Sequence, residues 1–372
     1  MKKPTFHLIL ILIFFISCFT GSAKIAAHVD KTYFLQGKVD EKTIVLKIKC
    51  FNESPVRYLN YFFIEEKTDN YLEGNPMGNT WNFTSTDNQK KEISLVIKEE
   101  KDGNWKGFWR EGANKKINLI LSPIVINLDS KYYSYSQNKE LDLYDAYKIS
   151  ILNLEKTKTE KISKHFTLNW YLEKESNISL FRLESETKKI KPDSINTVLE
   201  NIQLSLIHTY FQYNPNRENL TFQPQITLLN ETLLSFKLIS NTILKNQNPV
   251  KTQQAFVLNL QNGVPIALED IIWFDEKNAK PDANAISETY EYRKKLFAPK
   301  VFAILNELYP EKMQSNNCDL NKVSTWAIPN FAITKQGILF SFNHSPTCDF
   351  IDWAIIPFEK LTPYLQKKYK LN

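Results

Sequence analysis

Short stretches of alternating apolar and polar residues follow one another between residues 33 and 128, separated by turn residues. Alternation puts successive side chains on opposite faces of a strand, and no stretch here has a helical period. Such a region is typical of an antiparallel sandwich or a small up-and-down barrel. We therefore predict an all-β domain over residues 30–128. Its predicted strands cover residues 33–39, 43–51, 56–66, 92–100, 105–111 and 116–128.

Trp105, Gly107 and Trp109 share one face of a predicted strand because they alternate with period 2. A glycine between two indoles leaves room for them or for a close backbone. The three residues form either an aromatic shelf for a ligand or part of the core. We favour the core, since large aromatic residues supply much of the buried area of a small barrel.

The composition changes after residue 128. Residues 129–165 are polar and rich in tyrosine and lysine, which predicts a linker, with room for a short strand near residues 149–154. Residues 166–372 then mix strand patterns with two helical patterns, at 192–211 and 283–309. Pro299 predicts two helices or a kink in the second pattern. The fold class is α+β, with a β-barrel or sandwich domain first and an α+β domain after it.

The N-terminus has the anatomy of a signal peptide. Met1–Lys3 are followed by unbroken apolar residues from Leu8 to Ile16 and then by small and polar residues. This run is shorter than the roughly 20 apolar residues that a membrane-spanning helix needs. We expect a signal peptide within residues 1–23 to be removed, either by lipoprotein-type cleavage before Cys18, which would then carry lipid, or by cleavage after Ala23. The chain is then exported to the cell envelope, as a membrane-anchored lipoprotein or as a periplasmic protein.

The charge balance argues against a nucleic-acid partner. The chain has 47 basic and 41 acidic residues, a net charge of +6 at pH 7, and the two signs are interspersed. A nucleic-acid-binding domain usually concentrates its basic residues on one face. We expect a solvated, lysine-rich surface and contact with a membrane only through the lipid anchor.

Three cysteines follow the signal. Cys318 and Cys348 flank a segment that reads as strand, turn and strand, so its ends could meet in a disulfide bond in an oxidising compartment. Cys50 alternates with apolar residues in a strand and is expected to be buried. No Cys-x-x-Cys pair is present, so the cysteines indicate no zinc site.

The sequence contains no set of residues from which a reaction can be written. The histidines lack metal-site spacing, the nucleophile-elbow and P-loop motifs are missing, and we predict neither a metal nor a cofactor. His208 lies on the first helix, where packing or an ordinary surface role is expected. Near the predicted disulfide, aromatic and polar residues are candidates for a partner surface, which requires that some of them be exposed. These candidates are Trp326, His344, Asp349, Phe350, Asp352 and Trp353.

Three stretches of the second domain resemble the exported C-terminal domain of the anti-sigma factor RsiV, which is also found in the non-catalytic part of the peptidoglycan deacetylase PdaC. They are "LNLQNGVPIALEDII" (258–272), "NFAITKQGILFSFN" (330–343) and "IIPFEKLTPYL" (355–365). The resemblance covers about residues 166–367. It implies a binding or sensing module whose partner is a lysozyme-like protein or peptidoglycan.

One stretch departs from that family. Many members carry Tyr-x-Gly-Gly-Ala-His in the hairpin before the Asn-Gly turn, whereas this chain reads "LISNTILKNQNPVKTQQAF" (238–256). A ligand contact made there by relatives therefore cannot be transferred to this chain.

Two other classes of function stay open beside a non-catalytic binding module. An envelope glycan hydrolase would need two carboxyl groups about 5–10 Å apart in an open cleft. The acids available for it are Glu269, Asp270, Asp349 and Asp352. A structural scaffold would need no cleft at all.

Overall fold

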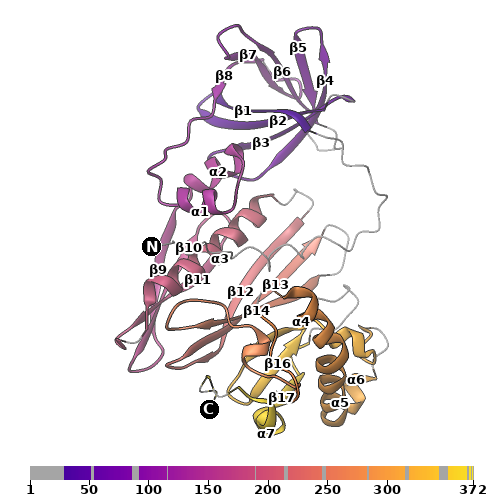
Figure 1. Ribbon diagram of the computed structural model, residues 1–372. Coiled ribbons are helices and arrows are strands. Elements are labelled where there is room, and N and C mark those ends of the chain that lie inside the picture. The colour runs from indigo at the N-terminus through magenta and orange to yellow at the C-terminus, as the bar shows by residue number, and fades with distance from the viewer. Residues whose placement is uncertain are drawn as a thin grey trace. The chain divides into compact units, whose positions relative to one another are not determined.

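Figure 1 shows the computed structural model of the chain. It describes residues 29–51, 54–85, 92–114, 116–188, 190–212, 217–244, 249–282, 285–314, 318–342, 351–366, 368–369 and 371. The chain divides into two compact units. The smaller unit runs up to Glu41 and continues with Val45–Tyr61 and Tyr71–Pro123. The larger unit takes Lys42–Ile44, Phe62–Asn70 and Ile124–Asn372.

The first eight strands form a closed antiparallel barrel in sequence order, with β1 pairing back to β8. Of the two predicted alternatives, the barrel is therefore confirmed. Its strands are β1 (Val29–Val39), β2 (Lys42–Phe51), β3 (Ser54–Phe63), β4 (Asn70–Met77), β5 (Thr80–Thr84), β6 (Ile93–Glu99), β7 (Trp105–Glu111) and β8 (Ile117–Pro123).

Strands β4 and β5 were not predicted. Their sequences, "NYLEGNPM" and "TWNFT", are polar, and each strand buries a single residue, Leu72 or Phe83. The apolar alternation that marks a strand is therefore too weak to read in them. They form because their neighbours supply backbone partners that close the barrel.

The interior of the barrel is filled by side chains. Trp105 and Trp109 are 1% and 0% exposed, which agrees with the prediction that they belong to the core. A Cβ atom on Gly107 would lie 1.8 Å from the carbonyl oxygen of Val96 on the neighbouring strand, so only glycine allows this approach. Cys50 is buried, as expected.

The interval 129–165 is not a linker, because it holds two helices and a strand: α1 (Tyr133–Asn138), α2 (Leu143–Ser150) and β9 (Leu154–Lys161). Asp142 caps α2 by accepting a hydrogen bond from the Asp145 amide at 3.0 Å. The buried face of α2 includes Lys148, so it does not read as an apolar stripe. Strand β9 buries only Leu154 and lies at the edge of its sheet, where lysines are common.

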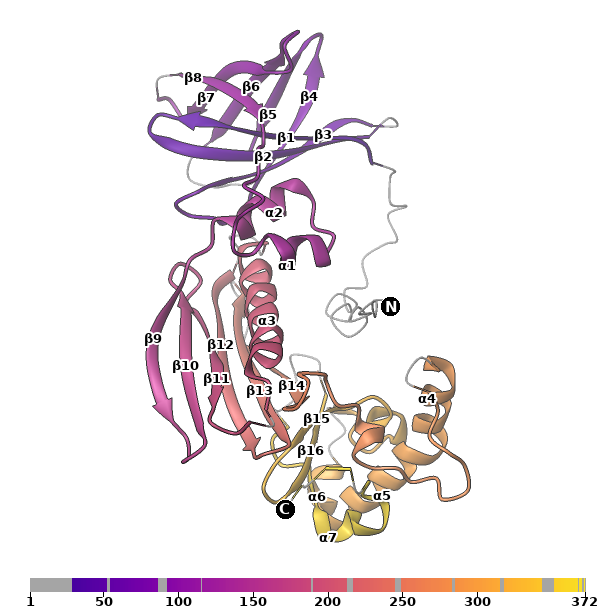
Figure 2. The same cartoon turned by 60° about the vertical axis from the view of Figure 1, so that its left-hand side comes forward.

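Three three-stranded antiparallel sheets follow in the larger unit, in the orders β11-β10-β9, β12-β13-β14 and β15-β16-β17. The new strands are β10 (Phe166–Glu173), β11 (Ile178–Ser185), β12 (Arg217–Leu229), β13 (Leu233–Leu244), β14 (Val250–Asn259), β15 (Asn330–Ile333), β16 (Gly337–Ser341) and β17 (Ile355–Pro357). Helix α3 (Pro192–Gln212), the first predicted helix, packs its apolar face on strands β10, β11, β13 and β14, and Figure 2 shows it alongside them.

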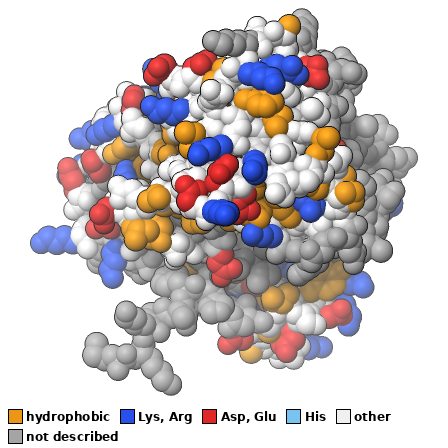
Figure 3. All heavy atoms as spheres, turned by 90° about the horizontal axis from the view of Figure 1, so that it is seen from above, with side chains coloured by type: hydrophobic (Ala, Val, Ile, Leu, Met, Phe, Trp, Pro, Cys, Tyr) orange, Lys and Arg blue, Asp and Glu red, His pale blue; other side chains and the backbone are white. Residues whose placement is uncertain are grey.

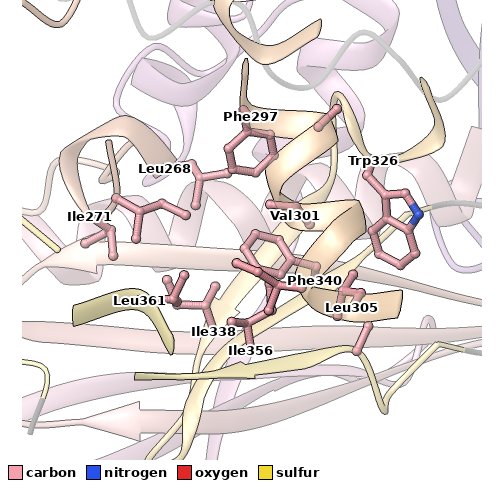
Figure 4. Packing of buried hydrophobic residues seen from close by; sticks show 14 of the residues in the cluster. Leu268, Ile271, Phe297, Val301, Leu305, Trp326, Ile338, Phe340, Ile356 and Leu361 are labelled. Atoms are coloured by element: carbon pink, nitrogen blue, oxygen red, sulfur yellow. The ribbon is translucent and has the colours of Figure 1, made fainter. Parts of the chain in front are cut away.

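The second helical pattern is interrupted, as Pro299 predicted. Helix α4 (Ile286–Tyr292) passes through a π-helical turn (Arg293–Phe297) into α5 (Ala298–Leu308). The short helices α6 (Pro310–Met313) and α7 (Phe358–Leu361) complete the larger unit. These helices and the last sheet enclose a core of more than twenty buried side chains, part of which is drawn in Figure 4.

Candidate functional site

Trp326, one of the six residues predicted to form a partner surface, lies in the core. Its side chain is 0% exposed, and its Nε1 donates a hydrogen bond to the Leu320 carbonyl at 3.1 Å. The Phe342 ring meets the indole edge-on, with 5.0 Å between ring centroids. Figure 4 shows Trp326 beside α5 with the other core residues. Because this indole has no exposed area, it cannot contact a partner in this fold.

Trp353 and Asp352 do reach the surface. Trp353 is half-buried: the Tyr309 ring meets it edge-on at 5.2 Å, and the Lys312 ammonium lies 5.1 Å from its ring centroid. Asp352 is exposed. His344, Asp349 and Phe350 lie outside the described residues, as does Cys18. Trp353 is therefore partly accessible to solvent, as the prediction of a partner surface requires.

The predicted disulfide involves one described residue only. Cys318 is buried, whereas Cys348 lies outside the described residues. Among the residues that the structure does describe, no two cysteines stand at disulfide distance. The bridge between Cys318 and Cys348 stays a prediction.

Asp352 borders a polar sheet face that the sequence did not reveal. Along β13, Leu234, Phe236 and Leu238 pack toward α3, so Ser235 and Lys237 point to the opposite face. Gln253 on β14 pairs with Ile239 and shares that face. We call Ser235, Lys237 and Gln253, together with Ile351 and Asp352, the Gln253 face.

The Gln253 side chain is 4% exposed and only half satisfied. Its Nε2 donates to the Ile351 carbonyl at 2.6 Å, which fixes the orientation of the amide. Its Oε1 is buried and has no hydrogen-bond partner among the described residues. A buried acceptor without a donor costs about 1–3 kcal/mol. Because this oxygen has almost no accessible area, it is an unsatisfied acceptor inside the fold and cannot contact a partner directly.

Lys237 places a positive charge on the same face. It is 8% exposed, and burial lowers the pKa of its ammonium group, while Asp352 opposes this shift and Lys251 adds to it. The face thus combines a cation, a neutral acceptor and the exposed carboxylate of Asp352. The sequence did not indicate this face, because the only clear pattern around Lys237 and Gln253 is the apolar alternation of their strands.

Two of the acids considered for glycan hydrolysis are held by cations. Glu269 forms a two-pronged ion pair with Arg293, with N···O distances of 2.6 and 3.0 Å. Asp270 pairs with Lys280. These contacts make both acids parts of the fold around the 3-10 turn Leu268–Asp270. Asp349, a third acid considered for this reaction, lies outside the described residues.

The larger unit also contains a buried network of charged residues that was not predicted from the sequence. Asp69 Oδ1 accepts hydrogen bonds from Lys148 Nζ and Tyr144 Oη, both at 2.5 Å, and Lys148 is 0% exposed. His208 is half-buried on α3 and lies 3.2 Å from Asp145 of α2. These contacts join α2, α3 and the segment 62–70, which indicates a structural role and fits the packing role expected of His208.

Three further observations concern the surface charge, metal sites and membrane-spanning helices. On the face drawn in Figure 3, basic and acidic side chains lie intermixed. Among the described residues, no group of three or more His, Cys, Asp or Glu side chains is arranged to hold a metal ion. None of the described helices has both the length and the apolar character needed to cross a membrane.

The chain matches no protein-family model and no curated protein.

Proposed function

We propose that this chain is an exported protein of the cell envelope, anchored by lipid on Cys18, that binds a partner without catalysing a reaction. The short apolar segment Leu8–Ile16, followed by Ser17 and Cys18, supports the export step. The exposed carboxylate of Asp352 and the half-buried indole of Trp353, which are neighbours in the chain, support the binding step.

The chemistry of these two side chains favours a partner rich in amide groups. Asp352 accepts an N–H or O–H group or pairs with a cation, and Trp353 offers part of an aromatic ring. Aromatic residues combined with a few fixed polar groups are typical of recognition sites. Peptidoglycan, with its N-acetyl and peptide amides, and a lysozyme-like protein both carry such groups. These are also the partners that the resemblance to the RsiV family implies.

The binding proposal predicts that Trp353→Ala and Asp352→Asn each weaken binding about tenfold or more, which corresponds to about 1.4 kcal/mol. The full chain is immobilised, and the affinities for soluble peptidoglycan fragments and for hen lysozyme are measured separately. Glu359→Gln serves as the control, because Glu359 is an exposed charge of the same unit on α7. If neither probe binds the wild-type chain, the structural scaffold becomes the better explanation.

The export proposal predicts a mature chain that begins at an acylated Cys18. Intact-mass measurement of the native protein should show the loss of residues 1–17 and the added mass of lipid. A chain that begins at Lys24 without lipid would instead indicate ordinary cleavage after Ala23. Recovery of the unprocessed chain from the cytosol would contradict export altogether.

A further inference from the structure

The turn between β10 and β11 contains a carboxyl group that is entirely enclosed. Glu173 ends β10 and is 0% exposed, and its Oε2 accepts a hydrogen bond from the Ser176 amide at 2.7 Å. Its Oε1 is also buried and has no hydrogen-bond partner among the described residues. The Glu175 side chain, two residues further along the turn, is 39% exposed. Burial disfavours the ionised form of a carboxyl group that is not fully hydrogen-bonded. The geometry of the turn therefore favours a protonated Glu173.

A single cation, Lys67, lies close to both acids. Lys67 Nζ lies 3.1 Å from Glu175 Oε2 and 3.9 Å from Glu173 Oε1, and the Lys67 side chain is 9% exposed. Lys67 belongs to the segment 62–70 and has a left-handed backbone, with φ of +56°. Its amide donates to the Phe63 carbonyl at 2.7 Å. When both acids are ionised, the cluster carries two negative charges against one positive charge.

The surrounding elements add no second cation at ion-pair distance from Glu173 among the described residues. Strand β9 places Leu154 opposite Glu173 and the exposed Glu155 beside it. Strand β11 begins there with the apolar Ile178. The buried ammonium group of Lys148 is bound by Asp69. Ionising Glu173 therefore leaves a buried charge that is poorly compensated.

We propose that Glu173, Glu175 and Lys67 form a pH-sensitive contact that holds the segment 62–70 against the β10–β11 turn while Glu173 is protonated, and that loosens when the proton leaves. The proposal concerns the conformation of the larger unit, and it stands independently of the function proposed above.

The direction of the pH effect follows from the two acids. Burial, and then the neighbouring Glu175 carboxyl group, raise the pKa of Glu173 to about 7, whereas the interaction with Glu173 lowers the pKa of Glu175 to about 2. Because Glu173 holds its proton more tightly in the folded state, its stabilisation is complete below the unfolded pKa of about 4.5 and is lost as pH rises through about 7. Glu175 contributes in the opposite sense, but only in acid, between about pH 4.5 and 2.

Hydrogen exchange on the full chain tests the proposal. Between pH 5.5 and 7.5, the protection factor of the Lys67 amide should fall about 20-fold, after correction for intrinsic exchange. Glu173→Gln keeps a neutral hydrogen-bonding group at every pH and should abolish the fall. Glu155→Gln, an exposed change on β9, should leave it intact. A pH-independent wild type, or a variant at position 173 that still shows the fall, overturns the proposal.

A second measurement needs no variant. The carboxyl carbon of Glu173, followed by NMR in the wild-type chain, should titrate with a midpoint near neutral pH. A midpoint close to the ordinary value of a glutamate, about 4.3, overturns the proposal even if Glu173→Gln does not fold.

Discussion

Replacing Asp69 with alanine should lower the free energy of unfolding of the larger unit by about 3–5 kcal/mol, the usual cost of leaving a buried charge without its partner. The Lys148 ammonium is fully buried and lies 2.5 Å from Asp69 Oδ1. The rings of Phe62 and Tyr144 lie 4.7 and 5.0 Å from Lys148 Nζ, and they replace little of a carboxylate's stabilisation. Tyr144 Oη also loses the oxygen to which it donates at 2.5 Å.

Urea unfolding followed by circular dichroism measures this loss. The matched control is the double variant Asp69→Leu with Lys148→Met, which replaces both charges by apolar side chains of similar size. Because apolar replacements of a buried ion pair are often neutral or stabilising, the double variant should recover most of the loss. A cost below about 1 kcal/mol for Asp69→Ala would contradict the structural role of this network.

Trp326→Ala should cost about 3–5 kcal/mol of unfolding free energy, as is usual for truncating a buried tryptophan. The indole is among the largest fully buried side chains of the chain, and its Nε1 has a fixed acceptor in the Leu320 carbonyl. The truncation leaves a large cavity against α5, and the freed carbonyl loses its donor. The change should raise the sensitivity to urea without altering the affinity for a partner at temperatures where the variant stays folded.

Trp353→Ala is the matched comparison for Trp326→Ala. Since Trp353 is half-buried, its truncation should cost clearly less stability and should instead reduce binding. The two tryptophans are 27 positions apart near the C-terminus and were indistinguishable as candidates in the sequence. If Trp326→Ala abolished binding in a chain with unchanged stability, the assignment of Trp326 to the core would be wrong.

Apolar periodicity predicted the elements in which it is strong. Six barrel strands, the helix α3 and the interruption near Pro299 all carry long or regular apolar patterns, and the structure contains all of them. Strands β4, β5 and β9 were not predicted because each of them buries only one side chain. Their formation depends on pairing with neighbouring strands rather than on a local apolar pattern. Helix α2 was missed because charged residues occupy its buried face.

The candidate site was predictable only in part. The sequence indicated Asp352 and Trp353 but joined them to Trp326, which packs in the core. It contained no sign of Lys237 or Gln253, since a lysine or glutamine in a strand usually faces solvent. The tertiary structure buries both residues and brings Gln253 into contact with Ile351, 98 positions further along the chain.

The sequence by itself determined the features that depend on local pattern: an N-terminal apolar segment too short to span a membrane, an all-β region, and an α+β region with two helical stretches. The tertiary structure decided the closure of the barrel, the burial of Trp326 and the partners of Asp69, Glu173 and Gln253. The physical reason is that periodicity reports which face of an element is apolar, whereas the energy of a buried polar group depends on partners brought together by folding.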